Sequence, residues 1–566
     1  MVSRDFTSHR FLAYLIPVYA LFWAGSPCAQ TLPGPADAAR VDQREILQPV
    51  ESSVLTQTPP MKILPTVVAP VGSKEVTLTL RRVRIDGMRA FSTSEIDDIY
   101  EPYLDRTITL DVLWLMAGQL TERYRNAGYF LSRVTVPEQE VSDGVVRLQV
   151  IEGYIGEVQY DDPMGQRPLV KRWLKRLQSY RPLKAEQIES VLLQLNDLPG
   201  VNVRAVLEPI KKQESDGAVR LILQSQATPK VSGQVSFDNN GSRFLGPYQA
   251  FAQAQTVFAP MHRTTATLLS TLPWDELKYG GLKHEIALIP GGNLELYGTR
   301  TDAEPGFTLA PQEIKSESTQ LGVAFAYKFL RQRQENLTGR VAFEARDTDS
   351  DILGTPLTRD AIRALRANMA YEGLDALGGT DFLSATLSQG LELFGASEAG
   401  QLNLSRAEAE PDFTKFEARL THIQPIGSEW VAVAGIAGQV ASDPLYSAEE
   451  FGYGGQAFGR AYDESEITGD HGIAATAELR YTGFPAWEGM QAVPYGFYDI
   501  GSVWNEDGGS GGRASGSSAG VGVRLATETG ISANVGVAFP LTREIANPLY
   551  GNGKNPRLLL QIAYGF

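Results

Sequence analysis

A two-residue alternation of apolar and polar side chains runs through the C-terminal part of the chain, from about residue 228 to Phe566. In one stretch Leu321, Val323, Phe325, Tyr327 and Phe329 alternate with Gly322, Ala324, Ala326 and Lys328. A period of two is that of a β-strand, whose successive side chains point to opposite faces. We count about sixteen such stretches of roughly ten residues, which is the length of a membrane-spanning strand.

The polar face of several stretches carries charge. Arg340, Glu344 and Arg346 alternate with Val341, Phe343 and Ala345, and Lys415, Glu417 and Arg419 alternate with Phe416, Ala418 and Leu420. A soluble β-sandwich also alternates, but so many stretches with recurrent charge favour an antiparallel barrel that faces lipid outside and water inside. The barrel must be closed, because an open edge would leave backbone groups unpaired in hydrocarbon.

The N-terminus predicts export. Basic residues precede a short apolar stretch from Phe11 to Ala24, and small residues follow, so residues 1–29 are interpreted as a signal peptide. The alternative is a lipoprotein signal with Cys28 lipidated, which Pro27 fits poorly. Since Cys28 is the one cysteine of the chain, we expect neither a disulfide framework nor a thiolate metal site.

Several classes of function are disfavoured. A formal net charge of −15 argues against nucleic-acid binding, because phosphate attraction needs clustered Lys and Arg. The five His residues show no paired ligand spacing. The run from Gly551 to Lys554 lacks the Walker spacing, and no Gly-x-Ser-x-Gly motif is present. We therefore expect no catalytic residues, cofactor or metal.

Three further zones precede the barrel. Residues 30–74 have linker composition, with a possible short helix from Ala36 to Leu47 that is either a solvated tail or a movable plug. Residues 75–152 and 153–227 each have a mixed α+β pattern of about 75 residues, within the range of an independent fold. The barrel is assigned to residues 228–566.

In the first α+β unit we expect strands at Val76–Leu80, Val83–Ile85, Arg133–Val136 and Val145–Glu152, and helices at Thr93–Tyr103 and Asp111–Ala127. Asp111 is placed to cap the second helix and Gly128 to end it. In the second unit we expect strands at Ile155–Tyr160, Val201–Leu207 and Val219–Gln224, and helices at Pro168–Ser179 and Ala185–Asn196.

A glycine-rich segment inside the barrel region is the most specific motif. Residues 451–480 contain Gly454, Gly455 and Gly459, and Arg460-Ala461-Tyr462 directly follows Gly459. This segment resembles the long sixth extracellular loop of the Omp85 superfamily, specifically of the two-partner secretion outer-membrane transporters (the TpsB, or ShlB/FhaC/HecB, type). The two α+β units resemble POTRA domains. The resemblance is specific in domain order and in this hairpin.

The resemblance implies that a hairpin at about 443–472 folds into the lumen and carries an Arg-Gly-aromatic tip. Ala461 departs from the family's glycine. The family also places an Asp, in a Phe-x-Asp pattern, on the inner wall to hold the Arg; here the matching segment is Phe497-Tyr498-Asp499. The strand alternation independently points Asp499 into the lumen. We expect Arg460 and Asp499 to form a latch, which either gates the pore or braces it.

The last strand carries a second resemblance. Leu558, Leu560, Ile562, Tyr564 and the terminal Phe566 share one face. This resembles the C-terminal signal by which outer-membrane proteins are recognised by the barrel assembly machinery.

The implied function is secretion. A TpsA-like exoprotein would dock on the POTRA units, with an exposed edge at about Ile188–Leu207 as the hypothesised site, and would thread outward through the barrel in the outer membrane. One alternative is an Omp85-type assembly insertase, which usually carries more than two POTRA units. Another is a simple porin, which would leave residues 75–227 without a purpose.

Overall fold

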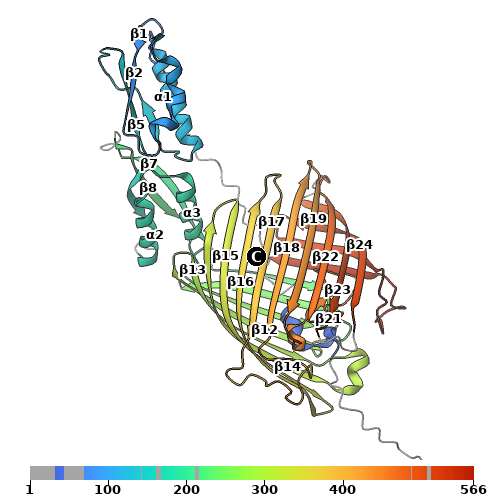
Figure 1. Cartoon of the computed structure of the whole chain (residues 1–566). Coiled ribbons are helices and arrows are strands. Elements are labelled where there is room, and N and C mark those ends of the chain that lie inside the picture. The colour runs from blue at the N-terminus through green and yellow to red at the C-terminus, as the bar shows by residue number, and fades with distance from the viewer. Residues whose placement is uncertain are drawn as a thin grey trace, which may run out of the picture.

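The computed structural model describes residues 32–43, 69–141, 143–160, 167–210, 216–227, 229–259, 261–485, 487, 489–506 and 512–566. Figure 1 shows two small α+β modules stacked at one end of a large β-barrel, with a short N-terminal segment inside the barrel. The predicted signal peptide, with Cys28, lies outside the described residues. Among the described helices, none is long and apolar enough to cross a bilayer.

The first module is built on α1 (Asp111–Asn126). Its strands are β1 (Thr77–Leu80), β2 (Arg82–Asp86), β3 (Arg106–Thr109), β4 (Arg133–Thr135) and β5 (Val145–Ile151). They form a three-stranded sheet in the order β2-β5-β4, with β2 parallel to β5, and a separate β1-β3 pair. One face of α1 packs on this sheet and contributes Leu113, Met116, Leu120 and Tyr124 to a common core.

Two local predictions for this module were wrong. The helix expected at Thr93–Tyr103 consists of three 3-10 turns, at Thr93–Glu95, Asp97–Ile99 and Glu101–Tyr103. Pro102 lacks an N–H donor, which disfavours a continuous α-helix through this stretch. Asp111 does not cap α1, because the helix begins with it and Leu110 occupies the cap position. Gly128 does end the helix, with the positive φ of +89° that glycine adopts at no steric cost.

The second module repeats the plan in shorter form. Its sheet has the order β6-β8-β7, from β6 (Tyr154–Tyr160), β7 (Val203–Pro209) and β8 (Ala218–Ser225). Helices α2 (Pro168–Gln178) and α3 (Ala185–Asn196) cover one face, where Trp173, Leu177 and Leu195 are buried. Since β8 is central, β7 is an edge strand.

The C-terminal region is a closed antiparallel barrel of sixteen strands, which confirms the predicted fold class. The strands are β9 (Val231–Asp238), β10 (Gln249–Ala259), β11 (His262–Thr271), β12 (Leu277–Ile289), β13 (Gly292–Ala303), β14 (Lys315–Arg331), β15 (Glu335–Ile352), β16 (Thr355–Leu374), β17 (Thr380–Gly390), β18 (Thr414–Ile426), β19 (Trp430–Ala441), β22 (His471–Tyr481), β23 (Met490–Trp504), β24 (Ala514–Thr527), β25 (Ile531–Pro540) and β26 (Arg557–Gly565). Strand β26 pairs with β9 and closes the ring.

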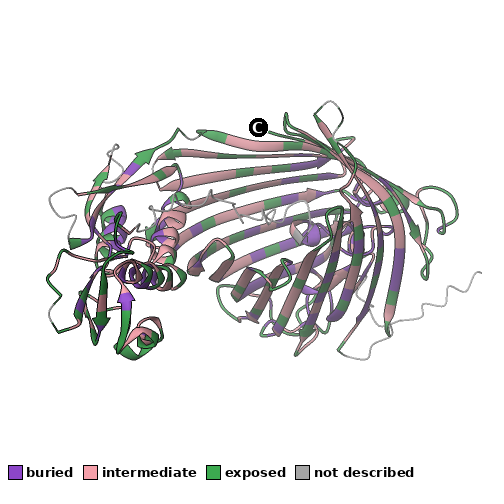
Figure 2. Ribbon diagram, turned by 90° about the horizontal axis from the view of Figure 1, so that it is seen from above, coloured by how far each residue is buried: buried purple, intermediate pink, exposed green. Residues whose placement is uncertain are grey.

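The two faces of the barrel wall differ as the alternation predicts, and Figure 2 shows burial alternating along its strands. Leu321, Val323 and Phe325 of β14 are exposed on the outer face. On the lumen face, charged side chains from different strands pair with one another. Arg340 Nε of β15, for example, lies 2.9 Å from Glu295 Oε2 of β13. The wall therefore presents apolar groups to lipid and paired charges to the interior.

The second module is fastened to the end of the barrel nearest it. Asp197, directly after α3, accepts hydrogen bonds from Lys328 Nζ at 2.6 Å and from Arg331 Nε and Nη2 at 2.8 and 3.0 Å. Arg333, in the turn after β14, forms a second ion pair with Glu189 of α3 at 2.9 Å. Bidentate contact with a guanidinium fixes orientation as well as distance. This contact sets the module at the mouth of the barrel.

We predict that this attachment is lost only in strong acid. Burial of the Asp197 carboxyl opposes its ionisation, but the Arg331 hydrogen bonds and the charges of Lys328 and Arg331 outweigh burial and lower its pKa below the ordinary 3.8. A carboxyl with a lowered folded-state pKa contributes stability above its unfolded pKa and loses it as pH falls through the folded one. The protection factors of the α3 amides, in which the intrinsic pH dependence of exchange is divided out, should therefore be unchanged from pH 7 to pH 5.

In the same assay Asp197→Asn should speed exchange in α3 and in the turn after β14, while Asp216→Asn, a change at an exposed carboxylate of the same module, should not. Equal exchange in both variants would show that Asp197 does not hold the module.

Candidate functional site

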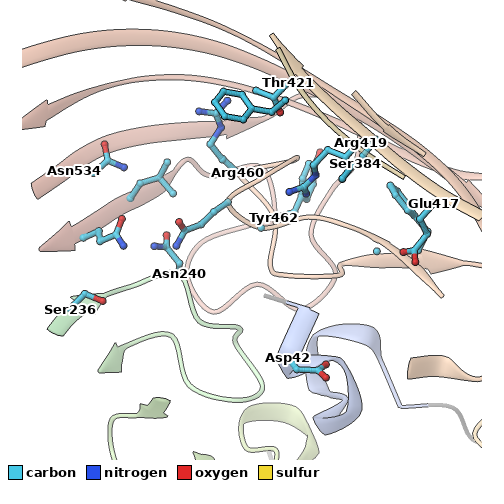
Figure 3. Close-up of a pocket in the computed structure, with 18 of the residues that line it drawn as sticks. Asp42, Ser236, Asn240, Ser384, Glu417, Arg419, Thr421, Arg460, Tyr462 and Asn534 are labelled. Carbon is cyan, nitrogen blue, oxygen red and sulfur yellow. The ribbon is translucent and has the colours of Figure 1, made fainter. Parts of the chain in front are cut away.

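The segment between β19 and β22 leaves the wall and folds back into the barrel. It contains a 3-10 turn at Ser447–Glu449 and the strands β20 (Phe451–Tyr453) and β21 (Ile467–Gly469), which pair with each other. We call residues 443–470 the lumen hairpin. Its tip lies beyond β20 and includes the predicted Arg460 and Tyr462, which also line the central cavity in Figure 3.

The three predicted glycines shape this tip. Gly454, Gly455 and Gly459 have φ values of +125°, +93° and +90°, which side chains rarely tolerate. A Cβ on Gly454 would lie 2.1 Å from the Asp463 carbonyl oxygen, and one on Gly459 would lie 2.8 Å from the Tyr453 ring. Both the backbone conformation and the space therefore require glycine.

Arg460 and Asp499 are brought together. The backbone N and Nε of Arg460 both donate to Asp499 Oδ2 at 3.1 Å, and Nη2 donates to Asp499 Oδ1 at 2.9 Å. The guanidinium carbon lies 3.5 Å from the centroid of the Phe497 ring, a cation–π contact. Asp499 is fully buried and also accepts from Thr476 Oγ1 at 2.7 Å. All four residues belong to the tip or to the adjacent strands β22 and β23.

Sequence reasoning missed Glu478, which is the second acceptor for Arg460. Its carboxylate receives Arg460 Nη1, Arg480 Nε and Arg524 Nη1, each at 2.6 Å. Glu478 lies on β22 two residues from Thr476, so both point to the same face of the strand. The alternation could have placed Glu478 in the lumen, but nothing in the sequence indicated which three cations it would meet.

Tyr462 and the end strands hold the other side of the tip. The Tyr462 hydroxyl donates to the carbonyl oxygens of Ser517 at 3.0 Å and Arg543 at 3.2 Å. Arg557 of β26 donates to the Tyr462 carbonyl at 2.7 Å. Ala461 is fully buried, so the position that departs from the family's glycine accommodates a methyl group.

Arg243, in the loop between β9 and β10, adds a further contact that the sequence did not reveal. It pairs with Asp463 and Glu466 of the hairpin, at 2.7 Å to each carboxylate. The hairpin is thus held by Arg557 of β26 and by Arg243 of the β9–β10 loop, on either side of the place where the barrel closes, as well as by β22 and β23.

The base of the hairpin forms ion pairs with the barrel wall. Glu449 accepts from Arg366 of β16 at 2.6 Å and lies 2.8 Å from Lys415 of β18. Arg366 also donates to Glu344 of β15 at 2.7 Å. The sequence placed Lys415 only on a polar strand face. The structure gives it a specific partner on the hairpin, Glu449.

The N-terminal segment also enters the lumen. The predicted helix at Ala36–Leu47 is instead two 3-10 turns, Gly34–Ala36 and Ala38–Gln43, and residues 44–47 lie outside the described part. The segment is mostly buried, and Arg346 of β15 binds both the Ala39 carbonyl and the Asp42 carboxylate. Figure 3 shows Asp42 at the edge of the cavity.

Arg40 joins this segment to the lumen hairpin. It donates to the carbonyl oxygens of Ser447 and Glu450, the latter at 3.0 Å, and to Ser465 Oγ at 3.3 Å. The remaining cavity has a volume of about 1290 Å³ and is lined by polar and charged groups from the wall, the hairpin and the N-terminal segment. The barrel interior is thus partly filled by two elements that side-chain contacts hold in place.

The predicted C-terminal pair lies on the outer wall. Tyr564 and Phe566 are exposed, with ring centroids 6.2 Å apart. Phe566 and Gly233 exchange backbone hydrogen bonds of 2.9 Å at the closing strand. The role of these residues in assembly stays a prediction.

Comparison with known proteins identifies the family. A model of the ShlB-type POTRA domain matches residues 78–153, and a model of the haemolysin secretion/activation protein ShlB/FhaC/HecB matches residues 296–523. The chain belongs to the haemolysin secretion/activation family of two-partner secretion transporters. The transporter accordingly lies in the outer membrane, with its POTRA region in the periplasm.

Curated relatives agree with this assignment. The transporter is 24% identical over 483 residues to the heme/hemopexin transporter protein HuxB of Haemophilus influenzae. The matched region covers 80% of this chain and 82% of that protein. It is 22% identical over 424 residues to the outer membrane transporter CdiB of Dickeya dadantii, covering 72% of this chain and 73% of that protein.

Solved structures share the fold. CdiB from Escherichia coli superposes with a TM-score of 0.72 at 17% identity, covering 95% of this chain and all (100%) of that one. BamA from Haemophilus ducreyi, lacking POTRA domains 1–3, gives 0.51 at 11% identity, with 87% of this chain and 100% of that one covered. The barrel with its preceding modules is therefore common to both kinds of protein.

We predict that Arg460 and Asp499 are strongly coupled. Removing one partner of a buried ion pair leaves an uncompensated charge and costs about 3–5 kcal/mol. Arg460→Ala and Asp499→Ala should each lower the temperature at which the folded barrel loses its heat-modifiable gel mobility. The double variant should be less destabilised than the sum of the two, as a double-mutant cycle requires of interacting residues. Additive effects would mean that the pair is not coupled.

Arg460→Lys provides the matched control. It keeps the charge, but its three N–H donors radiate from a single nitrogen and cannot reproduce the separate Nε, Nη1 and Nη2 contacts with Asp499, Glu478 and Thr476. We expect it to be closer to Arg460→Ala than to the unchanged protein.

Proposed function

We propose that this transporter binds an unfolded secreted protein at its POTRA modules and passes it outward through the barrel. The N-terminal segment and the lumen hairpin move out of the pore first. The proposal is supported by one arrangement above all. The lumen is obstructed by elements held through side-chain contacts rather than by the barrel wall, so it can be cleared without breaking the strand ladder. Within the family, export is favoured over the insertase alternative.

We place partner docking at the edge strand β7 and the neighbouring α3, around Ile188–Leu207. An unpaired strand edge can accept a further strand through main-chain hydrogen bonds, with little dependence on side-chain identity. Asp197, within this region, is tied to Lys328 and Arg331 at the barrel mouth. A chain captured on β7 is therefore held close to the pore entrance.

The remaining contacts in our proposal concern the membrane. The exposed apolar side chains of the barrel, such as Leu321 and Phe416, would contact outer-membrane lipid. Tyr564 and Phe566, exposed at the end of β26, would be read by the barrel assembly machinery before closure. Arg460, Tyr462, Phe497 and Asp499 would act as the latch on the hairpin.

The docking edge can be tested with single proline substitutions at Arg204, Ala205, Val206 and Leu207. Successive N–H groups of a strand point to opposite sides, so proline removes either a bond to β8 or a free donor at the edge. We expect the variants to alternate: those that keep the β8 ladder should fold normally yet fail to secrete a co-expressed partner exoprotein. Normal secretion by all folded variants would remove β7 from the docking role.

The N-terminal segment can be tested by conductance. Deleting residues 32–43 removes the groups that fill the lumen beside Arg346, so single-channel conductance in a planar bilayer should rise several-fold. Arg40→Gln, which keeps the segment but weakens its contact with the hairpin, should give brief openings to the same level. Unchanged conductance after the deletion would show that the hairpin alone closes the pore.

A further inference from the structure

One face of helix α2, in the second module, carries only positive charge. Its exposed positions hold four cations, which we call the basic face: Lys171, Arg172, Lys175 and Arg176. A solvated helix face usually carries charges of both signs, which pair along the helix. Helix α2 contains no Asp or Glu, and among the described residues no carboxylate forms a salt bridge with these cations. In a chain of formal net charge −15, such a face favours an external anionic partner.

The other face of α2 is already occupied. Val170, Trp173, Leu174 and Leu177 are buried in the core of the second module. The helix therefore has no free apolar stripe with which to enter a bilayer, in contrast to an amphipathic membrane anchor. Its basic face can meet a partner through charge alone.

Side-chain contacts place α2 close to the barrel rim. Trp173 Nε1 donates to Gln194 Oε1 at 2.8 Å, so the middle of α2 lies beside the last turn of α3. Asp197, three positions after Gln194 and about 4.5 Å further along the helix axis, binds Lys328 of β14. Figure 1 shows α2 at the end of the second module that adjoins the barrel. The basic face therefore begins near the rim.

The apolar outer wall ends at this same rim. Phe329, next to Lys328 in β14, points outward and is 61% exposed. Phe258 and Leu288, near the matching ends of β10 and β12, are also exposed. Aromatic side chains surround transmembrane barrels at the level of the lipid headgroups. Asp197 and the part of α2 beside it therefore lie at headgroup level.

We propose that the basic face of α2 binds anionic phospholipid headgroups in the periplasmic leaflet of the outer membrane. The two surfaces are opposite in charge, and the headgroup layer is continuous with the apolar wall that contacts lipid. Charges attract over about 8–10 Å at ordinary ionic strength, so headgroups beside the rim are within range of this face. An acidic protein segment would be attracted as well, but the position of the face at headgroup level favours lipid.

Lipid bound at α2 would not obstruct the proposed docking edge. Helix α2 packs on β6 and α3 on β7, so the two helices cover opposite edges of the sheet β6-β8-β7. Lipid contact at α2 therefore leaves the β7 edge open. It also gives the module a second attachment beside that of Asp197 to the barrel, and two attachments fix the tilt of the module against the membrane.

The test measures how close α2 lies to lipid headgroups in the full-length transporter. Ser179→Cys, directly after α2, is combined with Cys28→Ser and labelled with a fluorophore. The protein is placed in nanodiscs of phosphatidylcholine with or without phosphatidylglycerol, and a fixed fraction of the phosphatidylcholine carries a headgroup quencher. We expect quenching to be at least about twofold stronger with phosphatidylglycerol, because each Lys or Arg near an anionic surface favours contact. High salt should abolish the difference by screening the attraction.

Two matched variants remove the same number of charges at different places. The first neutralises the basic face and should abolish the effect of phosphatidylglycerol: Lys171→Gln, Arg172→Gln, Lys175→Gln and Arg176→Gln. The second neutralises four exposed arginines of the first module and should keep the effect: Arg81→Gln, Arg82→Gln, Arg89→Gln and Arg106→Gln. Heat-modifiable gel mobility reports a folded barrel, and protection of the α3 amides reports a folded second module. The salt measurement needs no substitution and decides the question if the first variant does not fold.

Equal quenching of the unchanged protein in both lipid compositions overturns the proposal, and so does an equal loss in the two variants. If the first variant fails to secrete a co-expressed exoprotein while the unchanged protein shows no lipid effect, the basic face belongs to the exported chain and the proposal is wrong. The lipid measurement requires no exported partner, so its result is independent of the proposed secretion.

Discussion

The structure depends on backbone hydrogen bonding in a solvent that offers none. Within hydrocarbon every N–H and C=O of a strand must pair with a neighbouring strand, so β26 must meet β9 and close the ring. Closure separates the alternate side chains into an outer and an inner set. The outer set is apolar, and the inner set can be polar because it faces an aqueous lumen. Its charges pair with one another on the wall, as Arg340 does with Glu295, and with the lumen hairpin and the N-terminal segment.

Burial makes these pairings selective. A buried charge is expensive unless several groups compensate it, and removing one partner is costly. Arg460 meets this condition with Asp499, Glu478 and Thr476, which together engage Nε and both terminal nitrogens. A planar guanidinium donates from three separate nitrogens at fixed angles, whereas the three donors of an ammonium share one nitrogen. The tip is therefore positioned by geometry as well as by charge.

Periodicity and local chemistry predicted much of this arrangement. The alternation along β14 and β26 gave their outer faces, and Gly454, Gly455 and Gly459 marked a tip that needs positive φ. The pairing of Arg460 with Asp499 was expected from the family pattern. The contacts of Glu478, Arg243 and Arg557 were not expected, because their partners are up to 318 residues away in the sequence and depend on the register of a closed ring. The 3-10 turns within Thr93–Tyr103 were not predicted, because turn type depends on tertiary packing as well as on residue pattern.

On the export path proposed above, the contacts of the two lumen elements impose an order on opening. The N-terminal segment is bound by Arg346 to the wall and by Arg40 to the hairpin, whereas the hairpin tip is bound to β22 and β23 through Arg460. The segment can leave while every contact between Arg460 and the wall persists. The hairpin cannot leave without breaking those contacts and the contacts to Arg40 together. On that path a passing polypeptide would replace these polar contacts one at a time, with the segment leaving before the hairpin.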